Sequence, residues 1–365
     1  MFSYIKFSLL TAKFIMKVLS IIIFSIMLTA NLDAQNEKVD DLFSEYTEAK
    51  CPGASVLISQ NGKIVFEKTY GFANLEERKL VEAKTNFRLA SVTKQFTATS
   101  ILILVQRGLL TLETTLTDIW EDFPEYGNTI TIKFLLNHTS GLIDYEDSVP
   151  DTSTVQVKDV DVMRMMYGQR NTYFKPGTRF KYSNTGYALL AMIVERIGKK
   201  RFTQFLLENI FKPLQMKTTI AHEEGVSIIE NRAYGYSRKD FGWIREDQSI
   251  TSAVLGDGGI YSNVEDLYKW DQSLYTNKIL FDTLRNEAMR RTILTNGEKI
   301  DYGYGWYLKK YKGNEVVYHT GSTQGFRNVI YRVPSRKFTV IILTNRNEGE
   351  PEKIADHIFA RYNKD

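Results

Sequence analysis

Ser91 and Lys94 stand three residues apart in the stretch LASVTKQFTA, where an apolar helical pattern begins. A serine at a helix start lies where free backbone N–H groups and the positive end of the helix dipole favour negative charge. A lysine one turn later lies on the same face. Burial and that positive end both lower a lysine pKa, so that the neutral amine can accept a proton. The pair could therefore be a nucleophile and its base, and the alternative is a helix cap followed by a solvated lysine.

A second proton carrier would be needed for the leaving group and for the water that releases an acyl group. The stretch FKPGTRFKYSNTGY supplies Tyr182 and Asn184 between a Pro-Gly turn and an apolar helical pattern, which would hold the tyrosine on a rigid edge. The same Tyr-x-Asn spacing also occurs at Tyr126, Tyr261 and Tyr275. Tyr261 is the main alternative, but the Ser262 and Asn263 that follow it are expected to cap a helix, so we favour Tyr182.

A third group, His319-Thr320-Gly321, lies between two strand-like segments in the stretch YHTGSTQGF. Glycine at a strand edge lets a ligand approach the backbone, whose N–H groups can bind an oxyanion. A lone histidine is more commonly a hydrogen-bonded core residue. The position of His319 on a glycine-rich strand edge nevertheless favours a place in the functional site over a core role.

Two sets of strands must position these residues. Near the start of the chain, two alternating runs flank Asn61-Gly62, which predicts a β-hairpin. Near the end, four runs read as strands: YGYGWYLKKY, NEVVYHTG, FRNVIYRVP and FTVIILTNR. The simplest packing joins both sets in one antiparallel sheet.

Helices are predicted mainly in the middle of the chain. Apolar spacing indicates helices over 91–108 and from Asn184 to about Gly198, and Ser262 with Glu265 forms the pattern of a capping box before a third. PEKIADHIFARY predicts a closing helix. We therefore expect an α/β fold of the α+β type, in which an antiparallel sheet from both chain ends is flanked by helices and carries an inserted helical lobe.

The first 34 residues resemble a secretory signal peptide, and Met16 is a possible true start. From there, a basic residue is followed by an apolar run from Val18 to Leu28 and then by small and polar residues. The run is short for a membrane-spanning helix. We expect cleavage and a periplasmic or secreted protein, with a retained membrane anchor as the alternative, and residues 35–365 as a single domain with two lobes.

Composition excludes several function classes. The formal net charge is +4, of which the leader, with three lysines and one aspartate, accounts for half, so nucleic-acid binding is not expected. One cysteine permits no internal disulfide, and the four histidines are scattered, so no metal site and no cofactor is expected. A small-molecule or peptide substrate is the expected partner, and the oligomeric state stays open.

The three motifs, in this order, resemble the serine β-lactamase and penicillin-binding protein superfamily. The resemblance is to its class C-like branch of class C β-lactamases, D-alanyl-D-alanine carboxypeptidases, D-aminopeptidases and family VIII carboxylesterases. It extends from about Pro52 to Tyr362 and is carried by PGASVLISQNGKIVFEKTYGFAN, FRLASVTKQFTA, LLNHTSGL, FKPGTRFKYSNTGYALLAMIVE, GDGGIYSNVEDL and YHTGSTQGF. Its fold, a sheet flanked by helices with a helical lobe, agrees with the one expected from the residues.

The resemblance implies a role for each residue. Ser91 matches the nucleophile, Lys94 and Tyr182 match the pair that takes its proton and later activates water, and Asn184 matches the side chain that orients Lys94 and substrate. The oxyanion hole would use the backbone N–H groups of Ser91 and Ser322. The implied function is an exported serine hydrolase that forms an acyl-enzyme from small esters, D-amino-acid peptides or β-lactams.

The sequence departs from the family pattern at two positions, and these departures bear on the implied function. His319 replaces the lysine of a K-T-G motif, so a permanent cation for a substrate carboxylate is missing, which favours the esterase and peptidase branches. Gln215 stands where the family usually has glycine, which indicates a local change of turn. A dedicated class C-like β-lactamase is the alternative within the family. A non-catalytic protein that binds penicillin or peptides is the alternative from another class.

Overall fold

The computed structural model describes residues 16–17, 38–150 and 152–363 of the 365-residue chain. The proposed signal peptide therefore lies almost wholly outside the described residues. Within them, no helix is long and apolar enough to cross a membrane.

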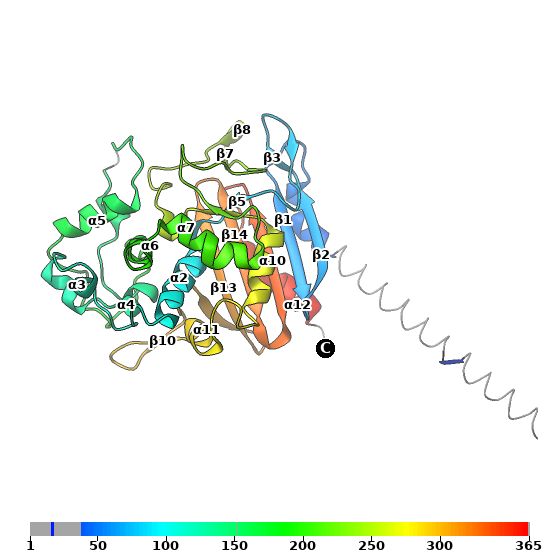
Figure 1. Ribbon diagram of the computed structural model, residues 1–365. Coiled ribbons are helices and arrows are strands. Elements are labelled where there is room, and N and C mark those ends of the chain that lie inside the picture. Colours follow the sequence, from blue (N-terminus) through cyan, green and yellow to red (C-terminus); the bar gives the residue numbers. More distant parts are fainter. Residues whose placement is uncertain (1–15, 18–37, 151, 364–365) are drawn as a thin grey trace, which may run out of the picture.

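Strands from both ends of the chain form one antiparallel sheet of six strands in the order β12-β13-β14-β15-β1-β2. Its strands are β1 (Ala54–Gln60), β2 (Lys63–Tyr70), β12 (Tyr307–Tyr311), β13 (Asn314–Thr323), β14 (Phe326–Val333) and β15 (Phe338–Thr344). The two ends meet where β1 pairs with β15, from Ala54 opposite Thr344 to Gln60 opposite Phe338. The predicted fold class is confirmed (Figure 1).

The predicted hairpin joins β1 to β2. Asn61 and Gly62 both have positive φ, +53° and +73°, which is the geometry of a two-residue turn that matches the twist of paired strands. Asparagine and glycine tolerate that backbone region best, which is why this dipeptide is the strongest short-range signal of a hairpin.

Apolar side chains cover both faces of the sheet. On one face, Val56 and Ile342 belong to the core under η1 (Asp41–Tyr46) and α12 (Pro351–Tyr362). On the other face, Leu57 and Ile341 belong to the larger core under α2 (Lys94–Gln106) and α10 (Val264–Ser273). Neighbouring positions of one strand thus face opposite layers. Figure 1 shows the sheet between these two helical layers.

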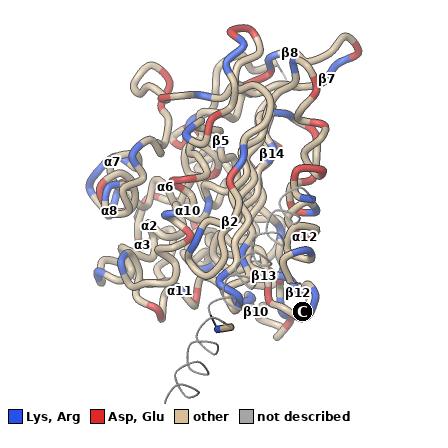
Figure 2. Tube along the Cα trace, turned by 90° about the vertical axis from the view of Figure 1, so that its right-hand side faces the viewer, with Lys and Arg blue, Asp and Glu red and all other residues tan. Residues whose placement is uncertain are grey.

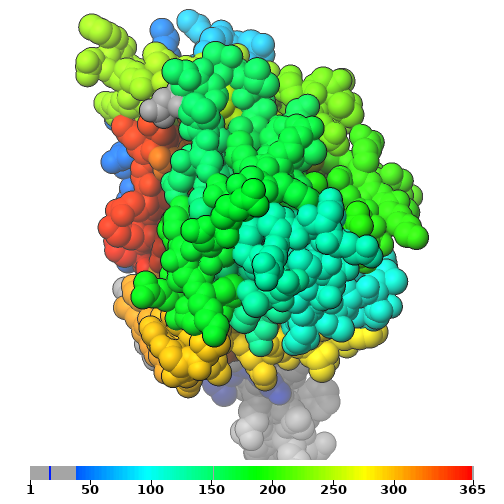
Figure 3. All heavy atoms as spheres, turned by 90° about the vertical axis from the view of Figure 1, so that its left-hand side faces the viewer, coloured from blue at the N-terminus to red at the C-terminus, as the bar shows by residue number. Residues whose placement is uncertain are grey.

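The remaining helices gather on the side of α2 and α10. They are η2 (Ala90–Thr93), α3 (Leu116–Ile119), η3 (Glu125–Thr129), α4 (Ile132–Leu136), η4 (Tyr145–Ser148), α5 (Asp159–Gly168), α6 (Asn184–Gly198), α7 (Phe202–Leu206), η5 (Leu207–Phe211), α8 (Lys212–Leu214), α9 (Leu255–Gly258) and α11 (Asp282–Ala288), with η6 (Pro334–Arg336) between β14 and β15. Figure 3 shows cyan and green segments from the middle of the chain covering most of that face. The predicted helices over 91–108, from Asn184 to Gly198, and at the end of the chain are confirmed.

Short strands lie outside the large sheet. They are β3 (Phe72–Asn74), β4 (Lys79–Leu80), β5 (Phe87–Arg88), β6 (Ile220–Ala221), β7 (Tyr236–Lys239), β8 (Gly242–Arg245), β9 (Ile260–Ser262), β10 (Thr292–Ile293) and β11 (Lys299–Ile300). Acidic and basic residues are interspersed over the molecule (Figure 2).

The predicted capping box at Ser262 and Glu265 is wrong. Ser262 ends β9, where it pairs with Phe87, and Asn263 caps α10 by accepting a hydrogen bond from the N–H of Asp266 at 2.9 Å. The strand pairing extends one residue further than the local pattern indicates, so the helix begins one residue later.

Candidate active site

Ser91 lies in η2, a single turn that runs directly into α2. The turn begins at Ala90, whose φ of +50° lies in the left-handed region that side chains with a Cβ seldom adopt. Just before it, the N–H of Leu89 donates to the carbonyl oxygen of Ile260 at 2.8 Å. Backbone strain of this kind persists only where the surroundings fix it, so the conformation that presents Ser91 is imposed by the fold.

Lys94 is fully buried, and its amine donates to three oxygens. Its Nζ lies 3.1 Å from Ser91 Oγ, 2.8 Å from Asn184 Oδ1 and 3.0 Å from the backbone oxygen of Asp257. The serine and lysine therefore form a contacting pair rather than a helix cap and a solvated side chain, because a solvated lysine would be exposed.

Burial lowers the pKa of Lys94 to about 8, because desolvation penalises the ammonium. The carboxylates of Asp257, Asp144 and Glu146 oppose this shift by favouring the charged form. An amine that titrates near neutral pH can accept the proton of the hydroxyl beside it.

Asn184 is the first residue of α6, after its capping residue Ser183. The Asn184 N–H donates to Asp144 Oδ2 at 2.7 Å, which fixes the start of the helix while the side-chain oxygen receives the Lys94 amine. The sequence motif and the apolar helix that follows it thus bring the amide to the lysine, 90 residues away in the chain.

Tyr182 lies beside the same amine. Its ring centroid is 4.9 Å from Lys94 Nζ, and its hydroxyl is buried without a hydrogen bond of good geometry to the described residues. Burial raises the Tyr182 pKa, and the neighbouring Ser91 hydroxyl opposes this. The phenol is therefore neutral in the physiological range and able to donate a hydrogen bond.

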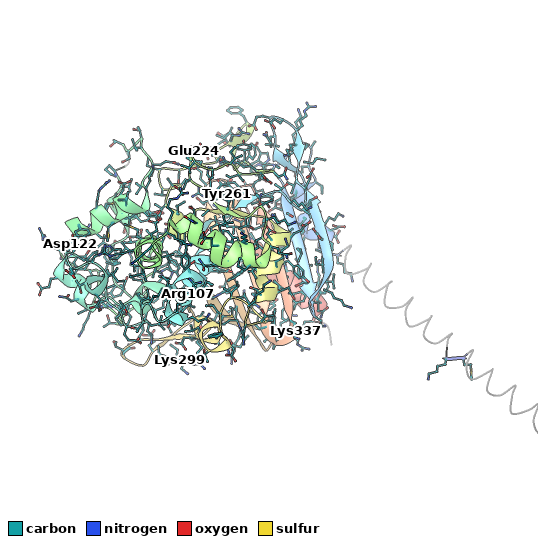
Figure 4. All side chains as sticks on the ribbon, in the orientation of Figure 1. Arg107, Asp122, Glu224, Tyr261, Lys299 and Lys337 are labelled. Carbon is teal, nitrogen blue, oxygen red and sulfur yellow. The ribbon has the colours of Figure 1, made fainter. Side chains whose placement is uncertain are left out.

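Tyr261, the alternative tyrosine, lies elsewhere. It belongs to β9, and its hydroxyl accepts from Arg232 and Gln248, each at 3.4 Å. Figure 4 shows it among the interior side chains of that region. Of the two, Tyr182 is the one beside Lys94.

Three carboxylates near Lys94 were missed by the sequence reasoning. Asp144 and Glu146 come from the segment around η4, and Asp257 comes from α9. The hydroxyl of Tyr145 donates to Asp257 Oδ2 at 2.9 Å. Burial raises the pKa of Asp257, and Lys94 opposes that shift. Acidic residues are common in loops, so only the fold identifies these as neighbours of the amine.

The edge of β13 lies against the turn that carries Ser91. β12 pairs with β13 only as far as Tyr318, so the stretch from His319 to Thr323 extends beyond that partner. A Cβ added at Gly321 would lie 2.0 Å from the carbonyl oxygen of Leu89. Glycine is therefore required for β13 to approach η2 this closely.

His319 is 1% exposed, and both of its ring nitrogens have partners within the protein. Nδ1 lies 2.6 Å from the carbonyl oxygen of Thr320, to which it must donate, so Nε2 accepts from the hydroxyl of Tyr302 at 3.0 Å. Burial and the nearby Lys94 lower the pKa of His319 to about 3. The ring is a neutral, internally bonded group.

A small polar cleft of about 50 Å³ opens above Ser91. Its lining includes Arg88, Ala90, Ser91, Tyr145, Glu146, Asn184, Thr251, Asp257, Gly258, Ser322 and Thr323. The predicted oxyanion-hole residues Ser91 and Ser322 thus line one cleft, whereas His319, Thr320 and Gly321 do not line it. Among the described residues, no group of three or more His, Cys, Asp or Glu side chains could hold a metal ion.

Comparison with known proteins gives the same family by sequence and by fold. The model of the Beta-lactamase family matches residues 39–362. Penicillin-binding protein 4* of Bacillus subtilis is 32% identical over 347 residues, covering 89% of this chain and 76% of its own length. Protein flp of Staphylococcus aureus is 28% identical over 335 residues, covering 89% of this chain and 66% of its own length.

Two solved structures share the fold. The octameric penicillin-binding protein homologue from Pyrococcus abyssi has a TM-score of 0.77 and 26% identity, and the match covers 89% of this chain and 76% of that one. The D-amino acid amidase from Ochrobactrum anthropi has a TM-score of 0.77 and 24% identity, covering 91% of this chain and 98% of that one. The chain belongs to the β-lactamase family, in its class C-like branch, whose members are typically serine hydrolases.

Proposed function

We propose that this protein is an exported serine hydrolase that works through a covalent acyl-enzyme on small esters, D-amino-acid peptides or β-lactams. The observation that carries the proposal is the contact of 3.1 Å between Lys94 Nζ and Ser91 Oγ, with the lysine buried and its pKa lowered to about 8. A nucleophile within hydrogen-bond reach of a base that titrates near neutral pH can attack a carbonyl group.

In the acylation step, Ser91 Oγ bonds to the substrate carbonyl carbon while its proton passes to the neutral Lys94 amine. The bond to the leaving group breaks, and that group receives a proton from the network of Lys94 and Tyr182. In deacylation, the same network takes a proton from water as the water oxygen bonds to the acyl carbon. The bond from that carbon to Ser91 Oγ then breaks, and Oγ recovers its proton from the network. The reaction needs no co-reactant other than water.

The remaining predicted residues orient the Lys94 amine and the substrate or stabilise the oxyanion. Asn184 holds the Lys94 amine and faces the same cleft, where it can orient substrate. The backbone N–H groups of Ser91 and Ser322 would bind the oxyanion, which is the position where charge develops. Gly321 lets the β13 edge approach η2, and His319 holds that edge through its hydrogen bonds to the Thr320 oxygen and to Tyr302.

The groups around the cleft favour esters, and peptides without a free carboxylate next to the reacting bond, over β-lactams. Glu146 and Asp257 are in the lining, and the guanidinium of Arg88 is engaged by the carbonyl oxygen of Ser252 at 2.7 Å. His319 is neutral because burial lowers its pKa. A β-lactam carries a carboxylate, as does a peptide with a free C-terminal D-amino acid, and neither would find a lysine at the His319 position.

Two other functions compete with this one. A dedicated class C-like β-lactamase would use the same residues with fast deacylation of β-lactams. A non-catalytic protein would keep the fold to bind cell-wall peptides. The occupied nucleophile, base and tyrosine positions favour catalysis over binding alone.

The test is hydrolysis of a p-nitrophenyl ester and of a chromogenic cephalosporin by the wild-type chain and by Ser91→Ala. We expect ester turnover that is lost in the variant and exceeds cephalosporin turnover. Faster cephalosporin turnover would identify a β-lactamase instead. Stoichiometric labelling by the cephalosporin without turnover would identify a penicillin-binding protein, and neither turnover nor labelling would favour the non-catalytic protein.

A further inference from the structure

His138 lies in the loop after α4, 1% exposed, with a φ of +60°. A histidine in the left-handed region is under backbone strain, which the surrounding contacts must outweigh. The proposed reaction does not use the His138 side chain. The contacts that outweigh the backbone strain involve Tyr182 and its two neighbours in the chain.

Two hydrogen bonds join His138 to the chain on either side of Tyr182. Its backbone oxygen accepts from the N–H of Lys181 at 3.0 Å. Its ring Nδ1 accepts from the N–H of Ser183 at 3.1 Å. The residues before and after the tyrosine are therefore both fixed to this one residue.

The imidazole also packs on the tyrosine itself. The ring centroids of His138 and Tyr182 are 4.2 Å apart, with an interplanar angle of 34°. Tyr307 and Tyr302 also flank Tyr182, at 6.3 and 6.2 Å. Because the Tyr182 hydroxyl has no hydrogen bond of good geometry among the described residues, the direction of this side chain depends on ring packing and on its backbone.

We propose that His138 is the positioning residue for Tyr182, holding the phenol toward Ser91 and Lys94 through two backbone hydrogen bonds and a ring contact. The proposal rests on the proposed function, because it assigns His138 to the same reaction. His138 touches none of the reacting atoms. Since Nδ1 accepts a hydrogen bond, the neutral ring carries its proton on Nε2, and burial lowers the His138 pKa so that this form persists.

Two variants separate the side chain from the backbone strain. Glycine adopts left-handed φ without penalty, and asparagine tolerates it well. His138→Gly removes the ring and the acceptor, whereas His138→Asn keeps an oxygen near the position of Nδ1. Comparison of the two therefore reports the acceptor and the ring contact without a difference in strain.

The first readout is the rate constant for acylation of Ser91 by a p-nitrophenyl ester. We expect His138→Gly to lower it about 10²-fold, as for a catalytic group displaced by about 1 Å, and His138→Asn to lower it less. In a Tyr182→Phe background, His138→Gly should cause little further loss, because the group that it positions is already absent. An equal loss in both backgrounds, or no loss in the wild-type background, would overturn the proposal.

The second readout does not need activity. Hydrogen exchange of the Ser183 amide, which loses its acceptor, should be faster in His138→Gly. Exchange of the Lys181 amide, whose acceptor is the retained backbone oxygen, and in the segment 89–97 should stay unchanged. Faster exchange throughout the chain would indicate general destabilisation, and unchanged exchange at Ser183 would contradict the proposed hydrogen bond. If the wild-type chain is not acylated at Ser91, the proposed function fails, and this second readout still decides whether His138 fixes the Tyr182 segment.

Discussion

The amine of Lys94 and the hydroxyl of Ser91 are 3.1 Å apart, and both lie where a strained turn passes into a buried helix. This arrangement both removes the lysine from solvent and places it against the hydroxyl of Ser91, the proposed nucleophile. Three protein oxygens accept the hydrogen bonds of the amine in place of water. Burial thereby makes the amine a base in the range where the enzyme would operate.

Lys94→Ala and Lys94→Arg should both lower kcat/KM for the p-nitrophenyl ester by about 10²- to 10⁴-fold, because each removes the group that accepts the serine proton. Arginine keeps a positive charge but stays protonated, so it serves as the matched test of the base function. Steady-state kinetics with thermal unfolding as a folding control would measure this. Activity of Lys94→Arg within tenfold of wild type would show that a neutral amine is not required.

Acylation should depend on pH through Lys94. Only the neutral amine accepts a proton, so the rate should rise with pH up to a plateau above about pH 8 and fall about tenfold per unit below it. Asp257 favours the charged form of Lys94. Asp257→Asn should therefore lower the Lys94 pKa and move the rising limb of the pH–rate profile to lower pH.

The matched control is Asp122→Asn. Asp122 lies at the edge of the molecule, far from the sheet, where it accepts from the hydroxyl of Tyr167 (Figure 4). It undergoes the same change of charge and should leave the limb in place. A limb that moves to higher pH in Asp257→Asn would contradict the assignment of this titration to Lys94.

Gly321→Ala should destabilise the fold by about 3 kcal/mol and abolish ester hydrolysis, because its Cβ would overlap the carbonyl oxygen of Leu89 and force β13 away from η2. Gly168→Ala is the control, since no atom beyond its chain neighbours and the backbone of its own helix lies within 4 Å of the added Cβ. Denaturant unfolding and activity are measured on both. If Gly321→Ala kept wild-type stability, the close approach of strand and turn would be in doubt.

Gln215→Gly should stabilise the protein by about 0.5 to 1 kcal/mol. Gln215 follows the last residue of α8 and caps its C-terminus with a φ of +58°, a conformation that costs a residue with a Cβ about 1 kcal/mol and costs glycine nothing. The backbone oxygen that accepts from Lys269 is retained. Gln215→Ala keeps the strain and should show no gain in the midpoint of thermal unfolding, and an equal gain in both variants would point to another cause.

Much of the fold could be predicted from the sequence because its signals are local. Asn61-Gly62 between two alternating runs defines one hairpin, and strand-like runs separated by turn residues define the strands near the end of the chain. The failure at Ser262 has a tertiary cause, since pairing of β9 with Phe87 extends the strand past the local capping pattern.

The residues of the candidate site likewise fall into those that local motifs predict and those that only the fold brings together. Ser91, Lys94, Tyr182 and Asn184 stand at element boundaries with recognisable motifs, so their meeting could be anticipated. Asp257, in the short helix α9, and His138, in the loop after α4, come near the lysine and the tyrosine only in the folded chain. His138 does occur in the stretch LLNHTSGL, but no local rule there indicates a contact with residues 181–183.

The most direct test of the central claim is covalent labelling of Ser91 with a fluorophosphonate, which forms a bond from serine oxygen to phosphorus as fluoride leaves. Mass spectrometry of the intact chain and of its peptides would measure the adduct. We predict one adduct, on the peptide that contains Ser91, formed faster as pH rises toward 8 and absent in Ser91→Ala. An unlabelled wild-type chain, or equal labelling of Ser91→Ala, would contradict the assignment of Ser91 as an activated nucleophile.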